Sequence, residues 1–560
     1  MSAGIDTLGG AAAAIPRVTH RSRAFRKFVL LSLGLLFGLI GQVYFMRRQY
    51  PLDGTLFYLV AIFLFARAVR GLPAAVGKPV TVATGYSLVR ALPAAVLGAL
   101  AFALFMQERY NPAIIVTMAA LLALIVAYWR QGLTETGKIH LEQWEWIAFG
   151  GILLLGLFLR LYHLGSFPGT LYLDEGDVGS LGLKMARSSN YLPFVPDFTG
   201  HPTFFYYGLG LYLKLVGISI IKLRLYTIAI GMLAIIATYF LGRELLGPRG
   251  ALIAAFTMAI STWATNFSRV VFDGIAVVLF VALTMFFLLR GLRTRQPMDF
   301  IWSGLAIGLG LNTYLAFRVV PLLVLLYLIY KVLGNRSFLR IYAPGLVLLG
   351  LALFVSFTPL GVYYLKHPGD LWSRAQSASV FQDIEREKSY APLWANIRKA
   401  FGMFNYQGDP RPRHNLPDNP MVDPITGIFL VLGFGYALLN WRKAENSMLI
   451  TWLAVGMLPG VFSLADSNPH SLRTITNLPA VCLLAALSAE RIDMFARVNC
   501  GAGVRSRLQV LAAVVAVIAL AANMHVYFDL QANNRSVYYD FDPVQNAVAQ
   551  EVARLGKTHN

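Results

Sequence analysis

Long apolar runs recur along the whole chain, and they limit its fold more than any other feature. A helix rises 1.5 Å per residue, so a run of about 20 apolar residues crosses the roughly 30 Å hydrocarbon core of a bilayer. Hydrophobic residues make up 57% of the 560 residues and charged residues only 14%, whereas about a quarter of an average soluble domain is charged. The composition excludes a soluble enzyme, a disordered chain and a fibrous repeat. It predicts an all-α polytopic membrane protein.

Counting these runs predicts about 15 transmembrane spans. The first run follows a basic segment that ends at Lys27, and it is too long for a signal peptide and lacks a convincing cleavage site after it. We therefore expect an uncleaved first span with a cytoplasmic N-terminus. The predicted spans are, roughly, residues 28–46, 51–66, 91–106, 111–129, 144–161, 226–241, 251–267, 271–289, 300–316, 319–333, 341–363, 424–440, 448–464, 473–489 and 508–527.

The positive charge of the chain indicates membrane topology rather than nucleic-acid binding. Its 48 Lys and Arg residues outnumber 28 Asp and Glu residues, and they concentrate in alternate short loops, as expected for the cytoplasmic side. This alternation requires that residues 203–222, which are apolar and aromatic, lie at the outer surface or re-enter without crossing. Two long polar stretches, 162–202 and 364–420, then both face the extracytoplasmic side.

Three regions follow from this topology. Residues 1–140 form an N-terminal accessory region of four spans, 141–500 a catalytic transmembrane core with the two outer loops, and 501–560 the last span and a short outer tail. No internal repeat of the kind found in many transporters stands out, and no long soluble domain follows the last span.

The first outer loop carries three acidic residues within four positions, Asp174, Glu175 and Asp177. Acids favour the first turn of a helix, so a solvated helix start is one interpretation. The other interpretation is a general base or a metal ligand at the opening of a membrane-embedded cavity. His201 closes the same loop, either as a polar cap or as a site residue.

A second group of candidates lies at three other predicted outer connections. Arg269 precedes Asp273 by four residues, a spacing that also suits a structural helix pair. Arg318 lies one helical turn after Tyr314, and any such arginine can simply extend to the lipid head groups. Together with Arg473, which follows His470 at the third connection, these guanidinium groups favour a phosphate site. The outer loop 364–420 adds Arg413 and His414, either in a proline-ordered surface loop or in a lid over the substrates.

In combination, these motifs resemble those of polytopic glycosyltransferases with the GT-C fold, in the group of protein O-mannosyltransferases and the lipid A aminoarabinose transferase (glycosyltransferase family 39). The resemblance covers roughly residues 145–490. The matching residues are Asp174-Glu175, His201-Pro202 before an aromatic helix, Arg224-Leu225 leading a span that ends in Gly242-Arg243-Glu244-Leu245-Leu246-Gly247, and Ser268-Arg269 with Asp273.

The resemblance implies a GT-C-like helix bundle that transfers a sugar from a polyprenyl-phosphate carrier to an acceptor hydroxyl at the extracytoplasmic face of the inner or plasma membrane. The acceptor would be a protein, a lipid or a glycan. In this interpretation Asp174 is the general base, and Glu175 orients the acceptor or, with His201, a divalent cation. Arg269, which matches a family motif, would bind the donor phosphate, and Arg318 and Arg473 are further candidates for this role because of their placement at outer connections. A direct single displacement would invert the anomeric centre. No other cofactor is expected.

Two alternatives remain open from the sequence. A transporter or flippase of a lipid-linked sugar would place charges near the middle of the spans and form an alternating cavity. A polymerase or ligase of lipid-linked glycans would share the core and differ in its acceptor. The Trp-Trp-Asp signature of oligosaccharyltransferase catalytic subunits is absent, which argues against en-bloc transfer to asparagine.

Overall fold

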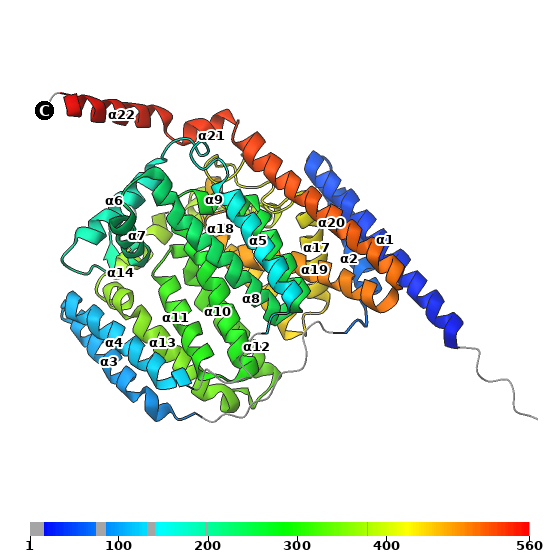
Figure 1. Ribbon diagram of the computed structural model, residues 1–560, viewed down its shortest axis with the longest axis horizontal. Coiled ribbons are helices and arrows are strands. Elements are labelled where there is room, and N and C mark those ends of the chain that lie inside the picture. Colours follow the sequence, from blue (N-terminus) through cyan, green and yellow to red (C-terminus); the bar gives the residue numbers. More distant parts are fainter. Residues whose placement is uncertain (1–15, 74–85, 131–139, 197–199, 378, 559–560) are drawn as a thin grey trace, which may run out of the picture.

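The computed structural model describes residues 16–73, 86–130, 140–196, 200–377 and 379–558, and these residues are mostly helical (Figure 1). The prediction of an all-α polytopic protein is confirmed, with one small pair of strands, β1 and β2, as an addition. The main elements are α1 (Pro16–Arg47), α2 (Pro51–Val69), α3 (Leu92–Met106), α4 (Tyr110–Tyr128), α5 (Gln143–Leu161), α6 (Leu173–Arg187), β1 (Phe194–Val195), β2 (His201–Pro202), α7 (Phe204–Val216), α8 (Ile220–Ile260), α9 (Thr262–Arg269), α10 (Gly274–Thr294), α11 (Pro297–Leu311), η5 (Leu315–Val319), α12 (Val320–Gly334), α13 (Phe338–Lys366), α14 (Pro368–Ser377), α15 (Val380–Glu387), α16 (Ala391–Gly402), α17 (Pro424–Leu439), α18 (Ala444–Val461), η6 (Ala465–Ser467), η7 (Ile475–Asn477), α19 (Leu478–Asn499), α20 (Ala502–Met524), η8 (His525–Gln531), α21 (Arg535–Asp540) and α22 (Pro543–Thr558).

Each predicted apolar run overlaps a helix, but fewer helices than runs qualify as spans. Among the described residues, ten helices are long and apolar enough to cross a membrane, and α11 and α17 are apolar but shorter. One of the ten, α8, comprises two helices joined at Gly247, where φ is 76° and Pro248 follows. The chain reverses direction there. The close packing of the two halves shows this, since a Cβ added at Gly242 would lie 3.0 Å from the Cα of Ala251. The count of 15 spans stays a prediction.

The loops predicted to be cytoplasmic meet at one end of the bundle. The Arg491 guanidinium donates to the carbonyl of Pro73 at 2.9 Å, and the Lys27 ammonium donates to the carbonyl of Arg70 at the same distance. At this end Arg243 also pairs with Glu145. The alternation of loops derived from the charge pattern therefore agrees with the arrangement of the helices.

The opposite end gathers the two polar stretches and the short connections assigned to the outer side. The Lys366 ammonium pairs with Glu108 at 2.7 Å, and α7 packs along α6. Arg224, near the start of α8, donates to the carbonyl of Thr170 at 2.8 Å. Residues 203–222 thus leave and return at the same end of the bundle, as the topology requires.

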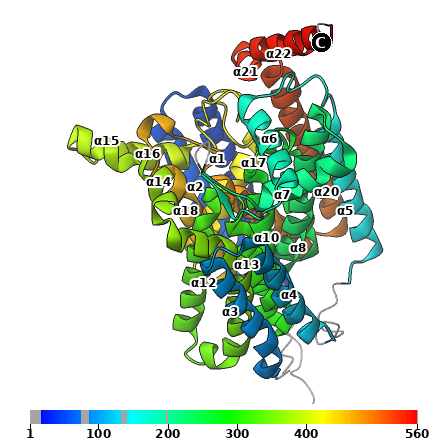
Figure 2. The ribbon, with the colours of Figure 1, turned by 90° about the vertical axis from the view of Figure 1, so that its left-hand side faces the viewer.

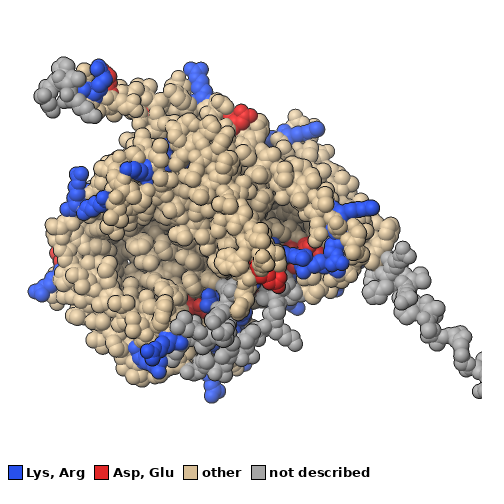
Figure 3. Space-filling view, in the orientation of Figure 1, with Lys and Arg blue, Asp and Glu red and all other residues tan. Residues whose placement is uncertain are grey.

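The four N-terminal helices form two separate hairpins. Helices α1 and α2 pack against each other and against α17, whereas α3 and α4 pack against α13. The hairpins lie on different sides of the bundle (Figures 1 and 2). Much of the face of the molecule seen in Figure 3 carries no charged side chain, as expected where helices contact lipid.

Candidate active site

The first outer loop places two adjacent acids in different environments at the start of α6. The Asp174 side chain is exposed, whereas Glu175 is fully buried. The backbone N–H of Tyr172 donates to Glu175 Oε2 at 3.1 Å, which caps the helix. Asp177, one turn further along, is half-buried. The local sequence therefore turns Asp174 outward and Glu175 inward.

Glu175 forms a buried bidentate ion pair with Arg224. Arg224 Nε lies 3.1 Å from Oε1 and Nη2 lies 3.0 Å from Oε2. The backbone N–H of Val271 donates to Oε1 at 3.0 Å. Arg224 also donates to the carbonyls of Pro168 and Thr170. Both oxygens of Glu175 are thus occupied by protein donors, which gives this residue a positioning role and argues against the predicted contact with an acceptor or a cation.

A polar cluster of His201, Tyr206 and Asp273 forms where β2, α7 and the start of α10 meet. His201 lies on β2, which pairs antiparallel with β1. The Tyr206 hydroxyl donates to Asp273 Oδ2 at 3.3 Å and lies 3.0 Å from His201 Nδ1. His201 Nδ1 is 3.7 Å from the same carboxylate oxygen. The structure thus brings two predicted site residues together through a tyrosine that the sequence did not single out.

Arg269 is buried and is engaged by the segment that precedes α6. Its Nη1 lies 2.9 Å from the carbonyl oxygen of Leu159 and 2.6 Å from that of Tyr162, and its Nη2 donates to the carbonyl of Phe167. Its guanidinium also lies over the ring of Phe528, 5.1 Å from the centroid. These contacts hold the end of α5 and the following loop, and they leave little of the guanidinium for a phosphate.

Arg318 lies in a different part of the outer end, beside α13 and α14. Its Nη1 donates to the carbonyl of Leu371 at 2.7 Å and its Nη2 to the Tyr364 hydroxyl at 2.8 Å. Tyr314, one turn before it, is buried. Helix η5, which contains Arg318, packs against η7, which begins two residues after Arg473.

The second outer loop folds around the buried carboxylate of Asp409. Its Oδ1 accepts from the Arg411 guanidinium at 3.0 Å, and its Oδ2 lies 3.0 Å from His414 Nδ1 and accepts from the Ser471 backbone at 2.7 Å. Burial opposes ionisation, but His414, His470 and Arg411 together hold the pKa of the Asp409 carboxyl well below its usual range. His470 and Arg473, from the third connection, interact electrostatically with this cluster.

Arg413 joins the second loop to the first and to the C-terminal tail. Its backbone N–H donates to Asp540 Oδ2 at 2.9 Å, and its guanidinium lies over the Tyr172 ring, 4.9 Å from the centroid. Burial raises the pKa of Tyr172 to about 12, against the opposing effect of Arg413. The tail also caps α6, because Asp542 Oδ2 accepts from the backbone N–H of Leu173 at 2.9 Å.

Aromatic contacts connect the candidates around Tyr172. Its ring lies 6.3 Å from that of Phe272, and the Phe272 ring lies 5.8 Å from the imidazole of His414. The structure therefore gathers the start of α6, the segment that carries Asp273 and the second outer loop. It leaves Arg318 to one side, and it gives Arg269 a role in the protein scaffold.

The sequence reasoning missed three contributors. Arg224 was noted only as part of a family motif, Asp409 only as part of a loop, and the tail 528–560 only as a short extension. A single arginine at the head of an apolar span was the available signal for Arg224, because such a charge needs a partner. Nothing in the sequence indicated that Asp542 caps α6.

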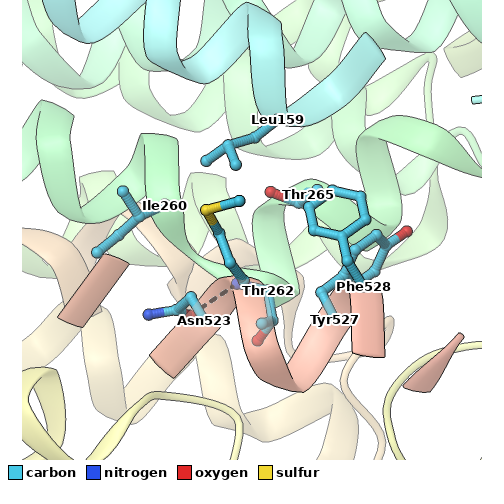
Figure 4. Close-up of a pocket in the computed structure, with 8 residues that line it drawn as sticks. Leu159, Ile260, Thr262, Thr265, Asn523, Tyr527 and Phe528 are labelled. Carbon is cyan, nitrogen blue, oxygen red and sulfur yellow. Dashed lines mark hydrogen bonds between the residues drawn. The ribbon is translucent and has the colours of Figure 1, made fainter. Parts of the chain in front are cut away.

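Two hollows in the structure are not lined by Asp174, Glu175, His201 or the three candidate arginines, although the first contains neighbours of Arg269. One, of about 10 Å³, lies between α5, α8, α9 and α20 and is lined by Leu159, Thr265, Asn523 and Tyr527 among others (Figure 4). It is smaller than the roughly 300 Å³ usual for small-molecule sites. The other is a surface depression along the C-terminal half of α6, lined in part by Lys184 and Arg187.

Comparison with known proteins supports the predicted resemblance. Residues 200–359 match the family described as dolichyl-phosphate-mannose-protein mannosyltransferase, which confirms the similarity to GT-C glycosyltransferases over this part of the chain. The matched range includes His201, Arg224, Arg269, Asp273 and Arg318 and begins after Asp174. No curated protein matches the sequence.

Several solved structures are similar to parts of this chain. The archaeal oligosaccharyltransferase AglB from Archaeoglobus fulgidus, in complex with an inhibitory peptide and a dolichol-phosphate, is 17% identical over 71% of this chain and 56% of its own, with a TM-score of 0.46. This chain therefore spans little more than half the length of that relative. ArnT from Cupriavidus metallidurans bound to undecaprenyl phosphate is 15% identical over 71% of this chain and 76% of its own, with a TM-score of 0.42. The S. cerevisiae protein O-mannosyltransferase Pmt1-Pmt2 complex bound to the sugar donor is 16% identical over 42% of this chain and 35% of its own, with a TM-score of 0.35.

Proposed function

We propose that this protein is a membrane glycosyltransferase that moves a sugar from a polyprenyl-phosphate carrier to an acceptor hydroxyl at the extracytoplasmic end of the bundle. The observation that carries the proposal is the placement of Asp174, an exposed carboxylate on a helix start that is clamped from several sides. The family match over residues 200–359 supplies the reaction class. The membrane would be the inner or plasma membrane, and the acceptor would be a protein, a lipid or a glycan.

Asp174 would act as the general base. Attack of a hydroxyl on the anomeric carbon acidifies that hydroxyl as the bond to the phosphate breaks, so a carboxylate with a reference pKa of about 3.9 can take the proton late in the step. Its neighbour Glu175 is neutralised by Arg224 at 3.0 Å, so it would not add a second negative charge beside the base. A direct displacement of this kind inverts the anomeric centre.

The departing phosphate needs cations on the opposite side of the sugar. Arg473 is the first candidate, because it lies at the outer end next to the Asp409 cluster and is half-buried. Arg318 is the second, because η5 packs against η7 close to Arg473 and two of its nitrogens contact neutral acceptors. Arg269 would act indirectly, by holding the loop before α6.

The placement of charges favours an enzyme over a transporter. Transport through the bundle calls for ionisable groups near the middle of the spans. Buried ion pairs of the described residues instead lie at the two ends, as with Glu145–Arg243 at one end and Glu175–Arg224 at the other. This pattern suits a reaction confined to one surface.

The test is sugar release from a panel of polyprenyl-phosphate hexoses and pentoses by the purified protein and by Asp174→Asn. We expect turnover of at least one donor by the wild type and a loss of 10²-fold or more in the variant, the order of effect of removing a general base. Asp466→Asn, an exposed acid at the same end, is the matched control and should retain activity. If Asp174→Asn turned over the donor as fast as Asp466→Asn does, Asp174 would not be the general base. If the protein bound donors but turned over none of them, the transporter would be favoured.

A further inference from the structure

Asp409, His414 and His470 form a compact group of metal-ligating side chains outside the residues that the proposed reaction uses directly. One ligand atom from each lies within 4.8 Å of the others. His414 Nδ1 is 3.0 Å and His470 Nδ1 is 4.0 Å from the same oxygen, Asp409 Oδ2. The three residues are 0%, 3% and 8% exposed. The three ligand atoms therefore lie close together inside the protein.

The protein holds this group in place without help from a ligand. Arg411 binds the other oxygen of Asp409 and also donates to the carbonyls of Ser467 and Pro469, which ties the second outer loop to the connection that carries His470. The loop is tightly packed, since a Cβ at Gly408 would lie 2.0 Å from the carbonyl oxygen of Asn419. The loop is thus closely packed around Asp409 by contacts within the protein.

The His470 imidazole points to a missing partner. Its Nδ1 is buried and makes no hydrogen bond with any residue that the structure describes, whereas buried polar atoms are nearly always paired. Oδ1 of Asp409 is taken by Arg411, whereas Oδ2 faces both rings and also accepts from the backbone N–H and the hydroxyl of Ser471, both at 2.7 Å, so an ion at Oδ2 would take the place of the Ser471 hydroxyl.

We propose that Asp409, His414 and His470 bind one divalent transition-metal ion of the zinc class. Two imidazole nitrogens and one carboxylate oxygen form a ligand set that zinc accepts, and a shift of the His470 ring toward Asp409 would bring the three atoms to the spacing of a zinc site. The ion would replace the proton now shared between His414 and Asp409, and it would cross-link the loop after α16 to the connection before α19. This site differs from the Glu175–His201 pair expected from the sequence, and it does not rest on the proposed glycosyl transfer.

The experiment measures zinc binding to the full-length protein in detergent, after chelator treatment, by metal analysis and by competition with a chromophoric chelator. We expect one zinc per chain in the wild type and at least ~10-fold weaker binding in His470→Ala, because loss of even an outer-sphere partner of a metal ligand costs about that much. His470→Ala removes no hydrogen bond of Nδ1, so the fold should persist. His525→Ala, which alters an exposed pair with Asp529, is the matched control and should bind as the wild type.

A second measurement keeps the proposal falsifiable if one variant folds poorly. Added zinc should raise the melting temperature of the wild type and of His525→Ala, because a ligand that binds the native state stabilises it, but not that of His470→Ala or His414→Gln. Substoichiometric zinc in the wild type, or equal affinity in His470→Ala, would overturn the proposal and leave a purely hydrogen-bonded cluster. Neither measurement uses a sugar donor, so its result is separate from that of the transfer assay.

Discussion

Arg224 and Glu175 are 49 residues apart in the chain and form a bidentate ion pair with Nε–Oε1 and Nη2–Oε2 distances of 3.1 and 3.0 Å. Both side chains are almost completely inaccessible to solvent. The pair fixes the first turn of α6 against α8, and Asp174 extends from that turn. A structural pair and an exposed acid therefore occupy adjacent positions in the sequence, and mutation should separate their roles.

Glu175→Gln should destabilise the protein, because it leaves the Arg224 guanidinium buried without its counter-ion. Breaking a buried pair by removing one partner typically costs about 3–5 kcal/mol. Thermal unfolding in detergent should therefore show a lower melting temperature for Glu175→Gln and little change for Asp174→Asn. A Glu175→Gln protein that melts like the wild type yet fails to bind its acceptor would contradict this assignment and restore the role expected from the sequence.

Arg269→Gln should reduce stability more than donor affinity. The Arg269 guanidinium satisfies carbonyl oxygens of Leu159, Tyr162 and Phe167, and each buried acceptor left unpaired costs about 1–3 kcal/mol. Arg473→Gln, by comparison, should raise the KM for the donor several-fold with little effect on the melting temperature. Measuring both quantities for both variants distinguishes the roles, and a reversed pattern would make Arg269 the phosphate ligand.

The helices were predictable because their cause is local. A run of apolar residues long enough to span a bilayer must be helical there, whatever surrounds it, and each predicted run overlaps a helix. The alternation of basic loops then assigned loops to ends without any knowledge of packing. It also indicated that 203–222 does not cross, and α7 and the start of α8 do lie at the end that holds α6.

The candidate site was less predictable because its partners are distant in sequence. Asp174 and Glu175 are adjacent carboxylic acids that the sequence does not distinguish. Contacts with Arg224 and with the backbone N–H of Val271 identify Glu175 as the buried one. The arginines at outer connections also look alike, yet Arg269 binds carbonyls of the protein itself. Spacing along the chain carries no information on such contacts when they come from other helices.

Asp542→Ala should loosen the start of α6 from more than 360 residues away. Its carboxylate accepts from the Leu173 backbone N–H at 2.9 Å, and loss of a side chain that caps a helix typically costs about 1 kcal/mol. The cost is local, so we expect faster amide hydrogen exchange over residues 170–176 and a fall in kcat with an almost unchanged melting temperature. Asp529→Ala, which removes an exposed acid on the preceding π-helix, is the control. Unchanged exchange at 170–176 in Asp542→Ala would show that the tail does not hold this loop.

Tyr206→Phe tests whether His201 and Asp273 act as one unit. The tyrosine hydroxyl contacts both, at 3.0 Å from His201 Nδ1 and 3.3 Å from Asp273 Oδ2, and the substitution removes that hydroxyl while keeping the buried ring. A neutral hydrogen bond contributes about 0.5–1.5 kcal/mol, so the melting temperature should fall slightly. If the cluster orients a substrate, kcat/KM should fall further than stability does, and Tyr206→Phe combined with Asp273→Asn should cost less than the sum of the single effects, since interacting residues are not additive. Additive losses would mean that the two polar residues act independently, and His201 would then be a cap on β2 rather than part of the site.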